Sequence, residues 1–587
     1  MTWINDFKTY FTKNQLVFIF ILLLCGLLLR WLQLDIRPFH HDESLHALYG
    51  KHMFQNPQIL FYKYDPMLHG PLLYHLIPFF YELFGISKFA ARMLPATLST
   101  LLLFFPFSFY RHLNPRAFLL LLTFLSLSPS LIYWGRFLRE DGLMILTFLI
   151  GVLAFIGKKE STKAFAITNL LLLPFTIKES AYIHPVLFFA FIFIDYLFES
   201  NKSESFFIQI KNIFIHGKLG AILATCLNIM LFIYLYTGGL RWADGLYQNM
   251  FTSGFTYWFA QHQKERIPGP FIFQTLILSS YDFVFFITIL SCSIHLYLGP
   301  NKKLKWFWIS SLALMALCYP LVKSFNFSSG SFWQWSKFKI PADIYFFILI
   351  FINGAISSIL LIRKRLKILA FLNYSFWAFL FTYSFLGERV PWLAIYPLFF
   401  GLFFVAFYLN DLKLIKTNKF RYFLIITFIF TLRVALKCNF SEAGFSNQLI
   451  SQVHTTDIFE NILFKIKNEI DFPIQKQPKL LSLGETVWPT SYFFFNEPNY
   501  SFMLGHKELT SFDYILSDLP NEELDLSLST RYQKIIVPMR HWWLPDYEKL
   551  SLLNWINYAL TQNPWSDTGA KDIALYSKIN TNTNSTN

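Results

Sequence analysis

The chain has 587 residues, of which 54% are hydrophobic and only 15% are charged, and its formal net charge is +14. Soluble domains carry about 25% charged residues, so this composition excludes a soluble globular protein and predicts a multispanning membrane protein. The basic excess does not indicate a nucleic-acid partner, because Lys and Arg cluster in short loops between apolar runs, where they report membrane topology.

Apolar runs recur along the chain, and a transmembrane helix needs about 20 such residues. We predict thirteen spans, near residues 15–34, 90–110, 117–133, 142–157, 164–177, 182–198, 219–237, 271–298, 306–322, 342–362, 368–386, 392–410 and 422–436. The basic loops alternate onto the side of the N-terminus, which is therefore cytoplasmic. The other loops and everything after residue 437 are predicted to face the periplasm of a bacterial inner membrane.

The first outer loop begins with a concentration of ionisable residues. The segment Asp35–Ser44 reads DIRPFHHDES and directly follows the first span. We predict that Asp42 is a general base that removes a proton from an acceptor hydroxyl, supported by Glu43, with His41 beside it in substrate binding. The structural alternative is that Asp42 caps the helix that starts near Glu43.

A second charged outer loop follows the third span and contains Arg136, Arg139, Glu140 and Asp141. Asp141 can meet Asp42 across a cavity, and two carboxylates from separate loops suit a divalent cation. Alternatively, a carboxylate orients one of the arginines, which then binds a substrate phosphate. A solvated Arg–Asp pair is the third possibility.

His69 and Arg92 are two further candidates for contact with a phosphate. His69 precedes an apolar stretch near 71–85 that is too short to span comfortably, so we predict an interfacial helix there with an anion site at its N-terminus. Arg92 opens the next span at the outer face. Its structural alternative is snorkelling to the interface.

Two acid–base couples lie at the outer membrane edge, Lys178 with Glu179 and Glu388 with Arg389. Ionisable groups at this depth are costly and are therefore paired or functional. We predict that all four bind substrate, with Arg389 facing a phosphate or pyrophosphate. A structural ion pair within each couple remains the alternative.

The chain changes character after about residue 437. Acids and prolines become frequent, and short β-like runs alternate with helical patterns. We predict a transmembrane domain over 1–436, an outer α/β domain over 437–579 and a disordered polar tail over 580–587. No phosphate-binding pattern such as GxxxxGK[ST] or GxGxxG occurs, so outer-face chemistry is expected to use a lipid-linked donor.

Several of these motifs together resemble the GT-C superfamily of membrane glycosyltransferases. The Asp42-Glu43 pair, the His69-Gly70-Pro71-Leu72 motif and the run Phe84–Arg92 are similar to the protein O-mannosyltransferase and lipid A aminoarabinose transferase group. A narrower resemblance, to the flippase activity-associated protein subfamily with its bacterial members, rests on four further motifs. They are Tyr257–Arg266, Gly387–Leu393, Glu485–Pro489 and Arg540–Asp546.

The resemblance implies a GT-C fold of about 13 spans that moves a sugar from a polyprenyl-phosphate donor to a glycan, lipid or protein acceptor. Asp42 corresponds to the catalytic acid/base, Glu43 to its neighbour and Asp141 to the second acidic position. His69 stands where relatives place a Lys or His near the lipid phosphate, although His-Gly-Pro replaces Lys-Pro-Pro or His-Pro-Pro here. No organic cofactor is implied, and a divalent cation at Asp42 and Asp141 stays open.

Two other functions remain as alternatives. A non-enzymatic accessory protein for the flipping or export of lipid-linked glycans predicts that Asp42→Asn leaves glycan transfer intact. A secondary transporter predicts charged residues at mid-membrane depth. Because the charges here lie mainly at the outer edge, the transporter ranks last.

Overall fold

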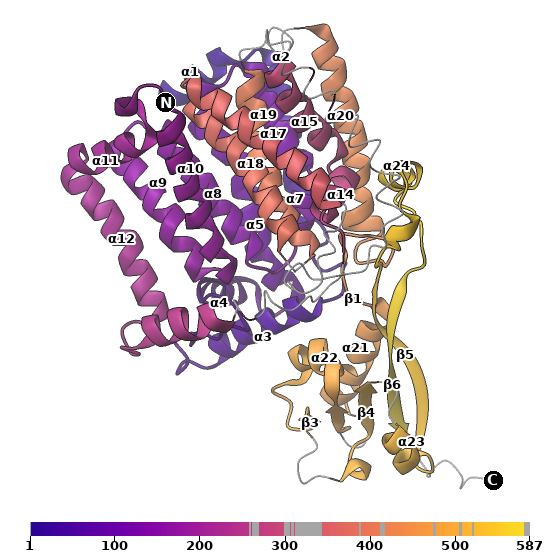
Figure 1. Ribbon diagram of the computed structural model, residues 1–587. Coiled ribbons are helices and arrows are strands. Elements are labelled where there is room, and N and C mark those ends of the chain that lie inside the picture. The colour runs from indigo at the N-terminus through magenta and orange to yellow at the C-terminus, as the bar shows by residue number, and fades with distance from the viewer. Residues whose placement is uncertain are drawn as a thin grey trace, which may run out of the picture.

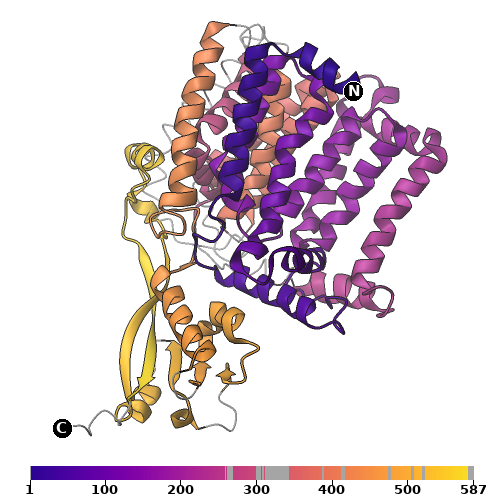
Figure 2. The same ribbon diagram turned by 180° about the vertical axis from the view of Figure 1, so that it is seen from behind.

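The computed structural model is a bundle of helices from one end of which a mixed α/β domain projects (Figures 1 and 2). The structure describes residues 2–257, 269–298, 343–386, 389–410, 417–473, 477–503, 508–518 and 522–579, together with residues 260, 306 and 310. The prediction of a mostly helical multispanning membrane protein with a C-terminal α/β domain is confirmed. The tail over 580–587 lies outside the described residues.

Most helices of the bundle overlap the predicted apolar runs. In chain order they are α1 (Thr2–Tyr10), α2 (Lys13–Trp31), α3 (His41–Gln55), α4 (Leu72–Phe84), α5 (Lys88–Phe104), α6 (Pro115–Leu127), α7 (Pro129–Gly135), α8 (Asp141–Ile156), α9 (Glu160–Leu172), α10 (Ile183–Phe198), α11 (Phe206–His216), α12 (Lys218–Tyr236), α14 (Phe273–Tyr281), α15 (Phe283–Leu298), α17 (Asp343–Arg363), α18 (Lys367–Phe385), α19 (Ile395–Leu409) and α20 (Asn418–Leu436). Of these, α1, α3 and α11 lie outside every predicted span. Local sequence explains several starts. The Asn114 side chain, for example, accepts from two backbone amides of α6, and Pro115 fits the first helical position.

Within the described residues, six helices are long and apolar enough to cross a bilayer, and two bent pairs raise the number to eight. The bent pairs are α6 with α7, at 51°, and α14 with α15, at 114°. These numbers are lower than the thirteen predicted spans. Helices such as α8 and α10 have only 16 residues each and reach about 24 Å, less than the roughly 30 Å hydrocarbon core. The predicted span at 306–322 lies almost entirely outside the described residues.

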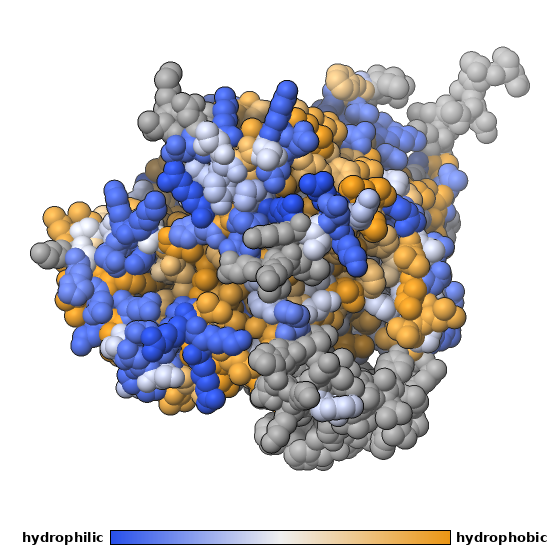
Figure 3. All heavy atoms as spheres, turned by 90° about the horizontal axis from the view of Figure 1, so that it is seen from above, coloured by the Kyte–Doolittle hydropathy of each residue, from blue (hydrophilic) through white to orange (hydrophobic). Residues whose placement is uncertain are grey.

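The bundle is built around α6 and α19, in which nearly every residue is buried. A helix that is apolar on all sides is expected at the centre of such a bundle. Figure 3 shows the molecule from the end at which the N-terminus lies, where hydrophilic side chains gather over the helix ends between hydrophobic flanks. At the opposite end α3 and α4 lie across the bundle (Figures 1 and 2).

The C-terminal domain is a six-stranded mixed sheet in the order β1-β5-β6-β4-β2-β3. Its strands are β1 (His454–Thr455), β2 (Leu480–Ser482), β3 (Tyr500–Ser501), β4 (Tyr514–Asp518), β5 (Tyr532–Trp542) and β6 (Gly569–Lys578), and its helices are α21 (Asp457–Asp471), α22 (Val487–Phe494), α23 (Glu522–Leu528) and α24 (Leu552–Thr561). Strand β2 pairs in parallel with β3 and β4, whereas the other pairs are antiparallel.

The C-terminal domain is fastened to the bundle at the start of α3. Glu460 accepts from the backbone amide of Phe39 at 2.9 Å and from Lys88 Nζ at 2.6 Å. The rings of Phe39 and Tyr492 meet edge to face with centroids 4.7 Å apart. These contacts place the sheet beside the first predicted outer loop.

Candidate active site

The site begins at the first turn of α3, which His40 caps. His40 Nδ1 accepts from the backbone amide of Asp42 at 3.2 Å, and His40 Nε2 donates to the carbonyl of Gln452 at 3.0 Å. Burial keeps the pKa of His40 well below its usual range, which fits the neutral tautomer that these two bonds require. The helix cap is therefore His40 rather than Asp42, so the Asp42 side chain is not used to start the helix.

Asp42 and His41 are the accessible members of this turn. Their side chains are 28% and 30% exposed, and His41 Nε2 lies 3.1 Å from Asp42 Oδ1. Burial lowers the pKa of His41 to about 4 even though Asp42 opposes this shift. His41 is thus a neutral imidazole beside the Asp42 carboxylate at physiological pH.

Four side chains of alternating charge run inward from Asp42. We call Asp42, Arg139, Asp141 and Lys178 the charge chain. Arg139 Nη1 pairs with Asp42 Oδ2, and Arg139 Nε lies 3.3 Å from Asp141 Oδ2. Lys178 Nζ lies 3.1 Å from Asp141 Oδ1. The predicted meeting of the two acidic positions is therefore mediated by an arginine, and Lys178 pairs with Asp141.

Two aromatic residues contact the charge chain: Trp392, just before α19, and Tyr396, in the first turn of that helix. The Trp392 ring lies 4.0 Å from the Arg139 guanidinium carbon, within the range of a cation–π contact. The Tyr396 hydroxyl donates to Asp141 Oδ1 at 2.5 Å. Asp141 is 1% exposed and receives three different donors, so it holds the cations in place and offers little to a substrate.

Lys178 is positioned by a close approach between two loops. Gly70 donates its backbone amide to Ile177 at 3.1 Å, and a Cβ atom at Gly70 would lie 2.4 Å from the backbone of Thr176. Only glycine therefore allows the turn that begins at Asp65 to lie against the segment before Lys178. The neighbouring His69 adopts a positive φ of 69° in this turn.

His46 links the face of α3 that carries Asp42 to the loop that carries Arg139 and Asp141. It is four residues from Asp42, and residues at this spacing share a helix face. His46 Nε2 lies 2.9 Å from Glu140 Oε1, while its Nδ1 bonds the Tyr74 hydroxyl, whose own proton goes to the Leu68 carbonyl. His46 thus joins α3 to the segment that carries Glu140 and to the Tyr74 hydroxyl.

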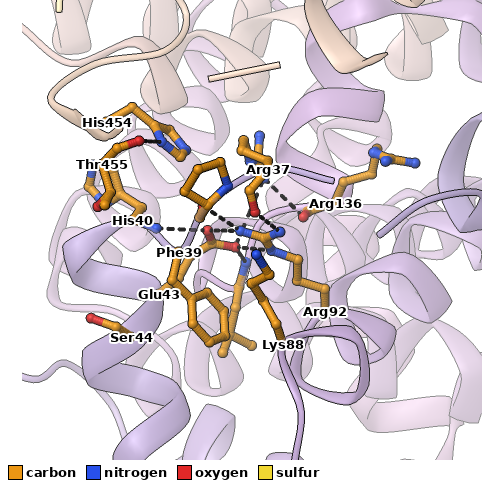
Figure 4. Close-up of polar contacts among 12 residues, drawn as sticks. Arg37, Phe39, His40, Glu43, Ser44, Lys88, Arg92, Arg136, His454 and Thr455 are labelled. Atoms are coloured by element: carbon orange, nitrogen blue, oxygen red, sulfur yellow. Dashed lines mark hydrogen bonds and ion pairs between the residues drawn. The ribbon is translucent and has the colours of Figure 1, made fainter. Parts of the chain in front are cut away.

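Glu43 points away from the accessible site and into a fully buried pair with Arg92 (Figure 4). Arg92 donates to its two carboxylate oxygens at 2.9 and 2.6 Å, and the backbone amides of Leu138 and His40 also donate to it. Burial alone would raise the pKa of Glu43. Arg92 and Arg37 outweigh this effect, so the pKa of this carboxyl group lies below its usual range.

Arg92 has no donor left for a phosphate. Its remaining N–H groups bond the carbonyls of Leu34, Arg37 and Pro38 between 2.7 and 3.0 Å. Five N–H donors meet five acceptor contacts, and the side chain is 0% exposed. The structure therefore gives Arg92 a structural position under the loop and not the predicted place against a phosphate.

Arg136 has a similar structural position at the end of α2. Its guanidinium donates to the carbonyls of Leu29, Leu32 and Gln33, which lie at and just beyond the last turn of that helix. This arrangement satisfies carbonyls that the helix leaves unpaired. Arg136 thus lies apart from the charge chain, although it is in the same loop as Arg139 and Asp141.

Of three other predicted substrate-binding residues, the structure describes the side chain of Arg389 alone. Arg389 is buried with its guanidinium 5.1 Å from the Phe271 ring and donates to the Leu386 carbonyl. The side chain of Glu179 and all of Glu388 lie outside the described residues.

The chemistry of Asp42 is set by Arg139. Burial alone would raise the pKa of Asp42. His41, Arg139 and other neighbours outweigh this effect and hold the pKa well below the usual range. Because His41 is itself neutral above about pH 4, Arg139 supplies the positive charge that acts at neutral pH. Asp42 is an ionised, accessible carboxylate with lone pairs available to a hydroxyl.

The residues around Asp42 offer a poor set of ligands for a divalent cation. Ligand atoms of His40, His41 and Asp42 lie within 4.8 Å of one another. Both nitrogens of His40 are already hydrogen-bonded, however, and Arg139 lies between the carboxylates of Asp42 and Asp141. The guanidinium takes the place between the two carboxylates that a bridging cation would require.

Sequence reasoning missed three residues of the site. The spacing of Asp42 and His46 on a predicted helix was a usable signal for His46. Trp392 lies in a motif that was singled out for its neighbours Glu388 and Arg389. No sequence signal connects Tyr396 to Asp141, because 255 residues separate them.

Comparison with known proteins gives likenesses in structure only. No protein-family model and no curated protein matches this chain. The crystal structure of ArnT from Cupriavidus metallidurans in the apo state is similar at a TM-score of 0.47 and 12% identity, over 96% of this chain and 98% of that chain. The same ArnT bound to undecaprenyl phosphate gives 0.42 and 11%, over 95% and 97%. The predicted subfamily is not matched by any family model and stays a prediction.

Proposed function

We propose that this chain is a membrane glycosyltransferase that moves a sugar from a polyprenyl-phosphate donor to a hydroxyl acceptor at the outer face of the membrane. The observation that carries the proposal is the state of Asp42. It is ionised and accessible, and Arg139 fixes it at the outer end of the charge chain. It lies at the end of the bundle opposite the N-terminus, where the sequence places the periplasm.

The reaction follows from these positions. Asp42 accepts the proton of the acceptor hydroxyl while that oxygen forms a bond to the anomeric carbon of the donor sugar. The bond from that carbon to the phosphate oxygen breaks, and its electron pair leaves with the polyprenyl phosphate. One displacement inverts the anomeric carbon.

The leaving phosphate is stabilised by cations of the charge chain. Arg139 and Lys178 lie on the protein side of Asp42, held by Asp141 in a low-dielectric environment where fixed charges act strongly. Lys178 contacts a single carboxylate among the described residues, so it has donor capacity for a phosphate oxygen. His69 remains a second candidate, since its ring lies 6.3 Å from that of His46.

The experiment is donor turnover by the purified full-length protein in lipid nanodiscs. Undecaprenyl phosphate, the lipid named for the second ArnT structure, is the carrier to test first, charged in turn with hexoses, N-acetylhexosamines and aminopentoses. We expect release of undecaprenyl phosphate from at least one donor, and its loss in Asp42→Asn.

The accessory alternative makes the opposite prediction for the same preparation. An export factor leaves every donor intact but changes the side of the bilayer on which the lipid-linked glycan is found. Intact donors with wild-type protein, together with accelerated flipping in vesicles, would establish that alternative and end the transferase proposal.

A further inference from the structure

Two motifs of the C-terminal domain, which lie 55 residues apart, meet in one polar cluster. Arg540 Nη1 donates to Glu485 Oε2 at 2.8 Å, and Arg540 Nη2 donates to the carbonyl of Trp488 at 3.1 Å. Lys571 on β6 approaches Glu485 Oε1 at 2.6 Å. We call Glu485, Arg540 and Lys571 the sheet cluster.

The sheet cluster is connected to Asp42 through the edge strand of the domain. Arg540 on β5 is the register partner of Thr455 on β1, and His454 pairs with His541. The His454 ring lies 5.5 Å from that of His40 (Figure 4). The His40 and His41 rings are tilted against each other with centroids 4.0 Å apart. The β1–β5 edge is thus held against the first turn of α3.

The charges of the sheet cluster and those around Asp42 influence each other. After burial and Asp42, Arg540 is the next influence on the pKa of His41, and Glu485 opposes it. Asp42 in turn raises the pKa of Arg540, although burial has the larger and opposite effect. The sheet cluster therefore belongs to the electrostatic surroundings of Asp42.

The sheet cluster is open to a ligand. The Glu485 side chain is 51% exposed even though each oxygen contacts a cation, and the Lys571 side chain is 29% exposed. Arg540 is only 7% exposed, and its Nε has no hydrogen-bond partner among the described residues. Accessible acceptors and donors therefore alternate over a short distance.

The charge balance of the cluster selects the class of ligand. Two cations face Glu485 and the nearby Asp518, which lies 3.9 Å from Lys571, so the local formal charge is zero. A phosphate or an amine gains no net attraction there. A neutral ligand rich in hydroxyl groups can use both the carboxylate and the N–H donors at once.

We propose that the sheet cluster is a carbohydrate subsite that holds an acceptor sugar beside Asp42. The inference rests on the proposed function, since it names the class of acceptor for that reaction. Glu485 accepts from sugar hydroxyls and Lys571 donates to sugar oxygens, while Arg540 holds the Glu485 carboxylate in place. The charge chain then serves the donor, and the C-terminal domain serves the acceptor.

The test is ligand binding to the full-length protein, measured by saturation-transfer NMR with methyl glycosides of glucose, galactose and mannose as probes. At least one glycoside is expected to bind saturably, and Glu485→Gln and Lys571→Gln are each expected to weaken its binding at least about tenfold, the loss of one charge-assisted bond. Inorganic phosphate, tested as a competitor, is expected to leave the signal unchanged.

Asp525→Asn is the matched control. Asp525 pairs with Lys534 at 2.7 Å and is partly exposed, but it lies on α23 at the far end of the same sheet (Figure 1). Its replacement is expected to leave glycoside binding unchanged. Absence of binding for all three glycosides, displacement by phosphate, or equal loss in Asp525→Asn overturns the proposal.

Failure of this proposal is distinguishable from failure of the transferase proposal. Glycoside binding is measured without any donor, whereas donor turnover is compared between the wild-type protein and Asp42→Asn, both of which keep the sheet cluster intact. Melting temperatures of the two cluster variants, compared with that of Asp525→Asn, separate lost binding from lost folding. The milder Lys571→Gln variant decides the question if Glu485→Gln unfolds.

Discussion

Asp42 and Glu43 are neighbours in sequence, of the same charge, in the same helical turn, and yet they belong to two different regions of the molecule. Successive helix residues point about 100° apart. Asp42 therefore reaches the accessible site with 28% of its side chain exposed, whereas Glu43 is fully buried against Arg92. Exposure and unused lone pairs, more than residue type, separate a carboxylate that can do chemistry from one that holds the fold.

The same contrast separates their arginines. Arg92 uses all of its donors on Glu43 and on three carbonyls, so it fastens the loop before α3 to α5. Arg139 joins two carboxylates and faces the Trp392 ring. A network of alternating charges can respond to a substrate, while a closed pair resists change.

Replacing Asp42 should separate the two regions most strongly. We expect Asp42→Asn to lower donor turnover by about 10²- to 10⁴-fold, the usual contribution of a general base. The exposed Asp35 in the same loop offers a matched control, because Asp35→Asn removes a carboxylate without touching the charge chain. Retained turnover in Asp42→Asn would falsify the assignment of Asp42 as the base.

Replacing Glu43 should do the reverse, by acting on stability. Glu43→Gln leaves the buried Arg92 guanidinium without a counter-charge, and breaking such a pair costs about 3–5 kcal/mol. The free energy of unfolding in detergent measures this loss. The partly exposed Glu160, which pairs with Lys163 at 3.1 Å, is the control, and Glu160→Gln is expected to cost less than about 1 kcal/mol. Equal stability losses for Glu43→Gln and Glu160→Gln would contradict the structural role assigned to Glu43.

This contrast also shows where sequence reasoning succeeds and where it fails. The position of Asp42 at the end of a span and the acidity of Asp141 were visible as local patterns. That Arg92 and Arg136 donate to backbone carbonyls could not be predicted. In the sequence, an arginine at a membrane edge looks the same whether its N–H donors are free or already hydrogen-bonded.

Tertiary pairing explains the other misses. Lys178 and Asp141 are 37 residues apart in the sequence, and Tyr396 and Asp141 are 255 apart, so periodicity cannot connect them. The helical class and the C-terminal sheet follow from composition and hydropathy, which act over every residue. Individual contacts depend on packing that a single sequence does not reveal.

Replacing Arg139 by lysine should have a smaller effect. A lysine keeps the charge but is a compact point charge, so it can approach one carboxylate of the charge chain and not bridge two in fixed geometry. We expect Arg139→Lys to lower donor turnover about tenfold with a nearly unchanged pH profile. Arg92→Lys is the contrasting variant and should lower stability more than turnover. A loss of turnover in Arg139→Lys as large as in Asp42→Asn would mean that bridging geometry itself is essential.

Removing the charge of Arg139 should act on the pH profile. Asp42 must be ionised to accept a proton. Its pKa lies well below the usual range, so wild-type turnover should stay level as the pH falls to about 5. In Arg139→Gln burial still raises the pKa of Asp42 but the opposing charge is gone. The acid limb should then move up by about 1–3 pH units.

The loss of the Arg139 charge should also change how stability depends on pH. A carboxyl group with a lowered pKa contributes stability that is present above its unfolded pKa and is lost as the pH falls through its folded pKa. Arg139→Gln should remove that contribution at every pH above the unfolded pKa of about 4, neutral pH included. His41→Gln separates the two neighbours of Asp42, because His41, with a pKa of about 4, carries little charge above pH 5. Its replacement should leave the acid limb in place, and a shift equal to that of Arg139→Gln would assign the control of Asp42 to His41 instead.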